Sequence, residues 1–429
     1  MYAKFMIKRG VIMRLLIIDV NYEYKNPMYR QFYSNLSYCF DVEYFGPGYV
    51  DRKTLEKGIL NFINNTKKID AILLGTYFVY SSYKKMRYDA YVVHRKVIPY
   101  YYVNDAYQCC NSILEELYGI EDIIKIFYYY EDSCSMPEND YKIIKILNQK
   151  GFFLMSWPRE YMQEYSQRKI KNSSLLTNYA KKLTEEIETY IPMSIQAIGY
   201  NEIFFKTYSS RQFEWCVPGN RNIKYYAERE NILNIMREEE KKTDVWSFDP
   251  FQKLSVDSIE KKQLHWYKFR NNFEKCLTCF VGKNKYISSY PKSIYVAACR
   301  ENYLDSLRDS KKVYVDGGIG EFIVRKYFES CASGALTVVK KVPGLENMGF
   351  IDGKNCIVID GYSDIERRKK ELSNEEKNAQ IAREGQKMIL ENHMFYHRAE
   401  ALYQTIEAIK RGTYKTAIWQ NGKYIIREK

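Results

Sequence analysis

Short apolar runs alternate with amphipathic stretches along the first part of the chain. Residues 15–19, 71–75 and 152–156 read as buried parallel strands, and residues 54–65 carry apolar side chains at helical spacing between two of them. Parallel strands need crossover connections that are usually helices, so this order predicts an α/β fold. The other strands predicted in this part cover residues 41–45, 97–103 and 123–129.

The same alternation restarts after residue 205. Residues 173–190 are polar and helical, and the chain then becomes irregular around Pro192 and Gly199. A chain of 429 residues suits two cores of ordinary size, so we predict domains at 1–205 and 206–395, followed by residues 396–429. The later strands are predicted at 213–217, 313–315, 336–339 and 356–359, the final helix at 396–410, and a hairpin around Asn421-Gly422.

The stretch 316–334 reads DGGIGEFIVRKYFESCASG and follows a β-branched strand. Its glycines stand where a helix is predicted to begin, and free backbone N–H groups at a helix start attract anions. Glycine also lets a phosphate approach the backbone closely, and two basic residues stand one turn into the helix. The predicted diphosphate-binding groups are Gly317, Gly318, Gly320, Arg325 and Lys326.

Two carboxylates in this stretch stand eight positions apart. We predict that Glu321 and Glu329 share one edge of a helix that begins at Glu321. The alternative is an amphipathic helix with two solvated acids. If Glu329 were a surface ligand-binding group, Glu329→Ala should abolish binding or turnover and change stability by no more than about 1 kcal/mol.

The order of these residues resembles a known family. Glu321-x7-Glu329, followed by SCASG ending at Gly334, is similar to the E-x7-E signature of retaining nucleotide-sugar glycosyltransferases with the GT-B fold. The wider pattern, with PGLE at 343–346 and DGKN at 352–355, looks most like the spore-maturation-protein branch. The resemblance covers about residues 215–410. It departs at Ile323 and Ala335, where most members have glycine and proline.

The resemblance implies an enzyme with two Rossmann-like domains facing across a cleft, and a final helix that crosses back over the first domain. It implies transfer of a hexose-like sugar from a nucleotide diphosphate to a glycan, lipid-linked glycan or protein, with retention and without a metal ion. Glu329 would hold the ribose and Glu321 the donor sugar, while Gly334 would belong to the donor-side turn. Such enzymes build cell-surface polysaccharide.

Further candidates follow two predicted strands. Gly219, Asn220 and Arg221 end the first strand of the second domain, where a Rossmann-like domain receives its ligand. For Arg221 a surface loop charge is the alternative, and Arg229 reads as a helix-surface residue. Asp105 ends the strand at 97–103 and is the candidate for contact with the acceptor, with a helix cap as the alternative.

The chain carries 66 basic and 53 acidic side chains, a formal net charge of +13. This excess favours phosphates, nucleic acid or an anionic membrane face as partners, but no known nucleic-acid module is present. Two rival functions therefore stay open beside the transferase. One is a nucleotide-sugar epimerase of similar fold, and the other is a non-enzymatic basic protein that binds polyanions.

Ten scattered cysteines form no disulfide framework, which favours a reducing compartment. No apolar run is long enough to cross a bilayer, so we expect a cytoplasmic protein, with peripheral contact to the inner face of the plasma membrane as a further hypothesis. The Cys276-Cys279 pair has no second pair, and no HExxH glutamate accompanies His393 and His397. We therefore expect no metal and no cofactor other than the donor substrate.

Overall fold

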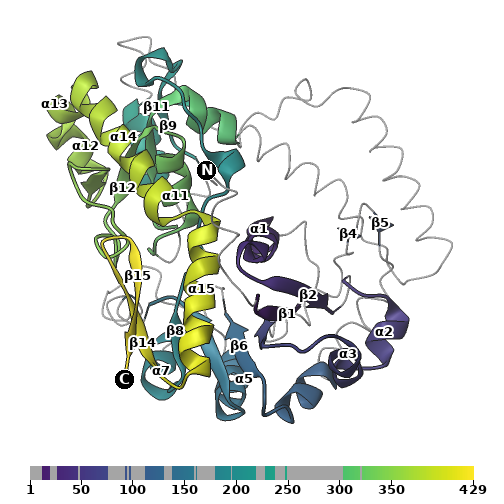
Figure 1. The fold of residues 1–429 in the computed structure, drawn as a ribbon. Coiled ribbons are helices and arrows are strands. Elements are labelled where there is room, and N and C mark those ends of the chain that lie inside the picture. Colours follow the sequence, from purple (N-terminus) through teal and green to yellow (C-terminus); the bar gives the residue numbers. More distant parts are fainter. Residues whose placement is uncertain are drawn as a thin grey trace, which may run out of the picture.

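The protein is an α/β molecule built on two separate parallel sheets (Figure 1). The first has six strands in the order β2-β1-β3-β6-β7-β8, and the second has five in the order β10-β9-β11-β12-β13. The predicted α/β fold with two Rossmann-like halves is confirmed. The computed structural model describes residues 12–19, 27–46, 49–75, 92–93, 96–97, 112–129, 138–158, 161, 179–194, 196–218, 228–236, 247–248, 303–318 and 321–429.

The first sheet follows the apolar runs of the sequence closely. Its central strands are almost wholly buried, because crossover helices lie between them along the chain and cover the sheet. The strands are β1 Arg14–Ile18, β2 Asp41–Phe45, β3 Ala71–Leu74, β6 Ile124–Tyr128, β7 Phe152–Ser156 and β8 Tyr190–Pro192. The helices are α1 Pro27–Asn35, α2 Arg52–Glu56, α3 Ile59–Asn65, α5 Glu138–Gln149 and α7 Tyr179–Glu186, with a 3₁₀ turn at Leu36–Tyr38.

One prediction for this half was wrong. The polar helix expected at 173–190 ends at Glu186, and Tyr190–Pro192 forms strand β8, which pairs in parallel with β7. Three residues that include a proline show no strand periodicity, so only the pairing with β7 reveals this strand. Of the strand predicted at 97–103, only Val97 lies in the described part, in the short antiparallel pair β4 Val92–Val93 and β5 Lys96–Val97.

The second sheet lies between residues 213 and 359. Its strands are β9 Phe213–Cys216, β10 Ser247–Phe248, β11 Ser310–Val315, β12 Leu336–Lys340 and β13 Ile357–Ile359. Its helices are α11 Arg325–Ala332, α12 Ser363–Arg367, α13 Lys369–Leu372 and α14 Glu375–Asn392, and 3₁₀ turns at Tyr200–Glu202 and Tyr208–Ser210 precede the sheet. The side chain of Asn374 caps α14 by accepting from Lys377 N at 3.0 Å.

Each sheet has one position where the strand order reverses. In the first sheet β1 lies between β2 and β3, and in the second β9 lies between β10 and β11. In open α/β sheets, ligands bind beyond the carboxyl ends of the strands at such a switch point. The topology therefore predicts a ligand-binding position at the ends of β9 and β11 in the second sheet and at the ends of β1 and β3 in the first.

The last helix, α15 Phe395–Lys410, returns to the first half of the molecule (Figure 1). The ring of Tyr403 lies 5.5 Å from that of Phe40, and Lys410 pairs with Asp70 at 2.9 Å. The helix continues into the hairpin β14 Tyr414–Gln420 and β15 Lys423–Glu428. Positive φ angles at Asn421 and Gly422 confirm the predicted turn.

The hairpin contacts both halves of the chain. Trp419 Nε1 donates to Pro192 O in β8 at 2.8 Å, and Gly422 N donates to Asn347 O in the second half at 2.9 Å. The predicted domain boundaries at residues 205 and 395 stay predictions.

Candidate functional site

A buried ion pair lies at the switch point of the second sheet. Asp316 directly follows β11, and its Oδ1 lies 2.5 Å from Nη2 of Arg229, in the helix at 228–236. The two side chains are only 8% and 4% exposed. The prediction that Arg229 is a helix-surface residue was therefore wrong. The arginine points into the sheet end because Asp316 supplies a partner for its charge there.

Lys326 joins this pair from the first turn of α11. Its Nζ donates to the carbonyl oxygen of Pro218, just beyond β9, at 3.1 Å. Burial, and then the charge of Arg229, lower the pKa of Lys326 to about 8. Two cations and one carboxylate thus meet where β9 and β11 end, at the start of a helix whose N-cap, Val324, has no polar side chain to cap the first amides. This combination suits an anion such as a diphosphate.

The glycines before α11 shape a tight turn. Gly318 has φ of +67°, which a residue with a side chain rarely adopts. A Cβ at Gly317 would lie 2.7 Å from the Cα of Glu321 and 2.8 Å from a methyl of Val342. Both glycines are thus required by the path of the chain itself, and their predicted role in letting a phosphate approach is a separate hypothesis.

Glu321 lies in this turn and not on the helix. It has φ of +49°, and α11 begins four positions later at Arg325, so the prediction that both carboxylates share one helix edge was wrong. Its Oε1 lies 3.0 Å from Nζ of Lys340, the last residue of β12, and the same Nζ lies 2.7 Å from Glu228. Neither partner could be predicted from the sequence, because nothing local links Lys340 or Glu228 to Glu321.

Glu329 is buried within a network that fixes α11. It is 4% exposed, accepts from the hydroxyl of Tyr303 at 2.5 Å, and lies 3.0 Å from Nε of Arg325. Arg325 also pairs with Glu202, which is 1% exposed, at 2.6 Å. The assumption of a surface carboxylate was wrong for Glu329, so its replacement should cost more than the roughly 1 kcal/mol expected of a surface change.

The remaining predicted residues do not join this cluster. Gly334 lies at the opposite end of α11, where a Cβ would come within 2.9 Å of Nη2 of Arg211. Its place at the donor stays a prediction. Five predicted site residues lie outside the described part of the chain: Asp105, Gly219, Asn220, Arg221 and Gly320.

A pocket of about 500 Å³ opens beyond the carboxyl ends of β12 and β13. Val342 lines it and also borders Gly317, in the turn that contains Glu321. Tyr161, from the first half of the chain, forms part of the wall. The lining residues are Tyr161, Lys341, Val342, Gly344, Leu345, Glu346, Asn347, Phe350, Asp352, Val358, Asp360, Asp364, Arg367 and Arg368.

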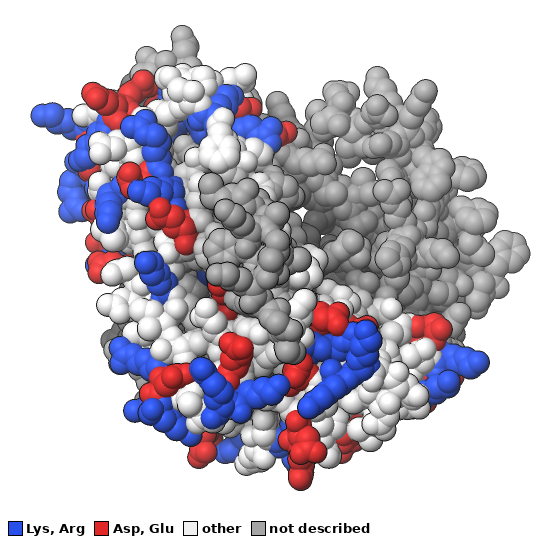
Figure 2. Space-filling view, viewed as in Figure 1, with Lys and Arg blue, Asp and Glu red and all other residues white. Residues whose placement is uncertain are grey.

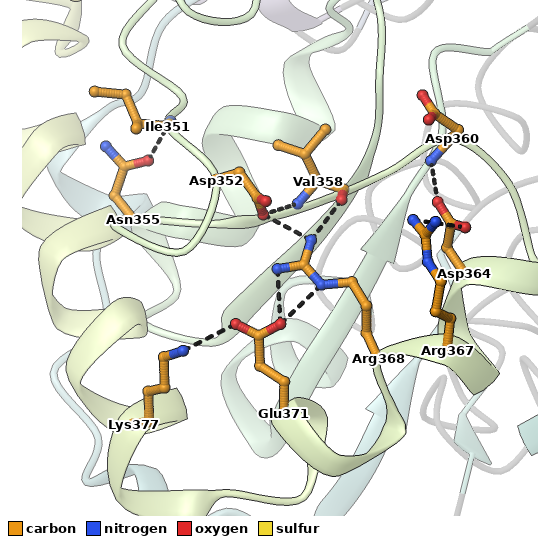
Figure 3. A network of polar contacts seen from close by, with 10 residues as sticks. All are labelled: Ile351, Asp352, Asn355, Val358, Asp360, Asp364, Arg367, Arg368, Glu371 and Lys377. Carbon is orange, nitrogen blue, oxygen red and sulfur yellow. Dashed lines mark hydrogen bonds and ion pairs between the residues drawn. The ribbon is translucent and has the colours of Figure 1, made fainter.

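Arg368 organises one wall of this pocket (Figure 3). Its guanidinium lies between Asp352, the carbonyl oxygen of Val358 and Glu371, with distances of 2.7 to 2.8 Å. Lys377 reaches the other oxygen of Glu371 at 3.0 Å. The network joins the turn before β13 to α13 and α14, and so holds the wall to the helices behind it.

Arg368→Ala should lower the free energy of unfolding by about 1–2 kcal/mol, because the substitution removes several charge-assisted hydrogen bonds at once. Arg367→Ala is the matched control. Arg367 is 72% exposed and pairs with its helix neighbour Asp364, so its loss should cost less than about 0.5 kcal/mol. Urea denaturation of both variants measures the difference, and equal costs would contradict this role for Arg368.

The switch point of the first sheet holds a buried carboxylate that was not among the predicted site residues. Asp19 follows β1, is 1% exposed and accepts from the hydroxyl of Tyr33 at 2.7 Å. A Cβ at Gly75, at the end of β3, would lie 2.1 Å from this carboxylate. The sequence contained one signal, an apolar strand that ends in an acid.

Both signs of charge are interspersed over the described surface of the face in Figure 2. Within the described ranges, no group of three or more His, Cys, Asp and Glu side chains is placed to hold a metal ion. In the same ranges, no helix combines the length and the apolar character needed to span a bilayer.

Comparison with known proteins adds a family to the second half of the chain. Residues 302–404, which include β11, α11 and every lining residue of the pocket except Tyr161, match the family described as Glycosyl transferase-like. No curated protein matches the sequence.

Several solved structures resemble the whole chain at low identity. Sucrose-phosphate synthase from Thermosynechococcus elongatus is 9% identical over 94% of this chain and 100% of its own, with a TM-score of 0.49. HepE from Anabaena, in complex with UDP, is 10% identical over 92% and 100%, with a TM-score of 0.46. A glycosyltransferase from Rickettsia africae is 8% identical over 94% and 99%, with a TM-score of 0.46.

Proposed function

We propose that this protein is a glycosyltransferase that moves a sugar from a nucleoside diphosphate to a hydroxyl acceptor. One observation carries the proposal. Three features meet at the switch point of the second sheet: Lys326, the Arg229–Asp316 pair and the uncapped start of α11. Except for Arg229, these groups lie within residues 302–404, which match a glycosyltransferase-like family. An anionic group of the size of a diphosphate suits this arrangement.

The donor would lie along the carboxyl edge of the second sheet. Its diphosphate would lie over Lys326 and the amides of α11, and its sugar would extend past Gly318 toward Glu321. Gly219, Asn220, Arg221 and Gly320 are proposed to complete the donor site. Glu329 is proposed to hold the ribose, which requires its present bond to Tyr303 to rearrange or to be shared.

The chemistry proposed is retaining and independent of a metal ion. Positive charge and helix amides, placed before the reaction begins, would stabilise the charge that grows on the leaving diphosphate. The E-x7-E motif and the likeness to the spore-maturation branch motivate retention. Arg325 was included among the diphosphate ligands, but its ion pairs with Glu202 and Glu329 favour a supporting role.

The acceptor is proposed to be a glycan, a lipid-linked glycan or a protein, and Asp105 remains the candidate residue on that side. The scattered cysteines motivate a cytoplasmic location, and the net charge of +13 motivates peripheral contact with anionic lipid. Liposome flotation at low and high salt tests that contact. Absence of flotation at low salt would remove it.

Differential scanning with UDP, ADP, GDP and their sugars tests the function first. One nucleotide should raise the melting temperature, and its sugar should then be transferred in the presence of an acceptor extract. A donor that is converted when incubated alone would favour the epimerase. Binding to any polyanion that weakens steeply as the salt concentration rises, and that does not depend on nucleotide, would favour a non-enzymatic polyanion-binding protein.

A further inference from the structure

Three charged side chains line the end of the proposed donor site where the sugar would lie. Their balance of charge differs from that at the diphosphate end. Lys340 lies between Glu321 at 3.0 Å and Glu228 at 2.7 Å, and all three side chains are partly exposed, at 20%, 31% and 22%. Two carboxylates surround one ammonium group here. At the diphosphate end, the carboxylate of Asp316 pairs with Arg229, and Lys326 interacts electrostatically with both.

These three residues come from separate elements that meet at one point. Lys340 ends β12, Glu228 is the first described residue of the helical stretch 228–236, and Glu321 is held in the turn before α11 with φ of +49°. Burial by itself would lower the pKa of Lys340, but its hydrogen bonds to Glu228 and Glu321 outweigh burial and raise the pKa above its ordinary value. The lysine therefore stays charged near neutral pH, and the group keeps a net charge of about −1.

The neighbouring pocket also has more acidic than basic lining residues. The pocket, which Val342 lines next to the turn of Glu321, has three basic and four acidic lining residues. A ligand that runs from the switch point toward the pocket thus passes from a positive environment into a negative one. An additional carboxylate on the sugar would meet repulsion there, whereas hydroxyl groups would find acceptors in Glu321 and Glu228 and a donor in Lys340.

We propose that Glu228, Lys340 and Glu321 form a charge-selecting wall that admits neutral or amino sugars and disfavours uronic acids. The inference rests on the proposed function, because it takes the sugar to lie at Glu321. It names the class of sugar, and it assigns Glu228 and Lys340 as specificity-determining residues. Lys340 also positions the carboxylate of Glu321.

The test compares UDP-glucose with UDP-glucuronate, which differ only in the carboxylate. Affinities and kcat/KM are measured for the wild type, Glu228→Gln and Lys340→Met, and UDP alone serves as the control for folding and for the diphosphate site. The wild type should prefer UDP-glucose by about tenfold or more. Glu228→Gln should reduce the preference toward unity, and Lys340→Met should increase it, while the affinity for UDP stays within about twofold.

The opposite shifts in the two variants are the decisive result, since a wall with a merely structural role would lower the affinity for both donors together. Lys340→Arg should keep the preference of the wild type. Equal binding of both donors by the wild type, or shifts of the same direction in the two variants, would overturn the inference. Failure of UDP, ADP and GDP and of their sugars to bind would instead count against the proposed donor site, which is a separate outcome.

Discussion

Lys326→Met should weaken the binding of a nucleoside diphosphate roughly 10- to 100-fold, as expected for the loss of one charge-assisted contact of about 1.5–3 kcal/mol. In the wild type the affinity should fall as the pH rises from about 7.5 to about 9.5, because Lys326, with a pKa of about 8, loses its proton in this range. A bound diphosphate favours the charged form of Lys326 and therefore shifts the fall in affinity to higher pH. Titration calorimetry across this range measures both effects.

Two further variants make this result specific. Lys326→Arg keeps its charge throughout, so it should retain most of the affinity and lose the pH dependence between about 7.5 and about 9.5. Lys387→Met removes an exposed lysine on α14 and should behave as the wild type. Unchanged affinity and an unchanged pH slope in Lys326→Met would show that this ammonium group does not face the ligand.

Arg325→Met should lower the free energy of unfolding by about 3–5 kcal/mol, because it removes the guanidinium that pairs with the two buried carboxylates of Glu202 and Glu329. Urea denaturation measures the loss. Replacing all three residues together, with Glu202→Gln and Glu329→Gln added, should recover part of it, since no uncompensated buried charge then remains.

The same variant separates two roles of Arg325. If the residue supports the fold, stability falls strongly and the affinity for UDP falls only as far as the site is distorted. A variant with wild-type stability and no affinity for UDP would contradict the buried network and restore Arg325 as a direct ligand of the diphosphate. Arg367→Ala again serves as the exposed arginine control.

The apolar pattern of the sequence determined most of the architecture. Strands such as β3 Ala71–Leu74 and β7 Phe152–Ser156 occur where the pattern predicted them, because a parallel strand that is buried on both faces is a short apolar run. The glycine-rich turn before α11, the lysine at 326 and the hairpin at Asn421-Gly422 were also found from local residues. These features depend on neighbours in the chain.

Only the tertiary structure decided which side chains face each other at the site. Arg229 looked like a surface residue until Asp316, 87 positions away, supplied its partner, and Lys340 and Glu228 gained their place beside Glu321 in the same way. Helix periodicity placed Glu321 and Glu329 on one edge, but the turn at Gly317 and Gly318 delays the helix and turns the two carboxylates to different partners. Which charged side chains pair at the end of a sheet depends on which strands lie side by side. The spacing of residues within one segment does not predict this pairing.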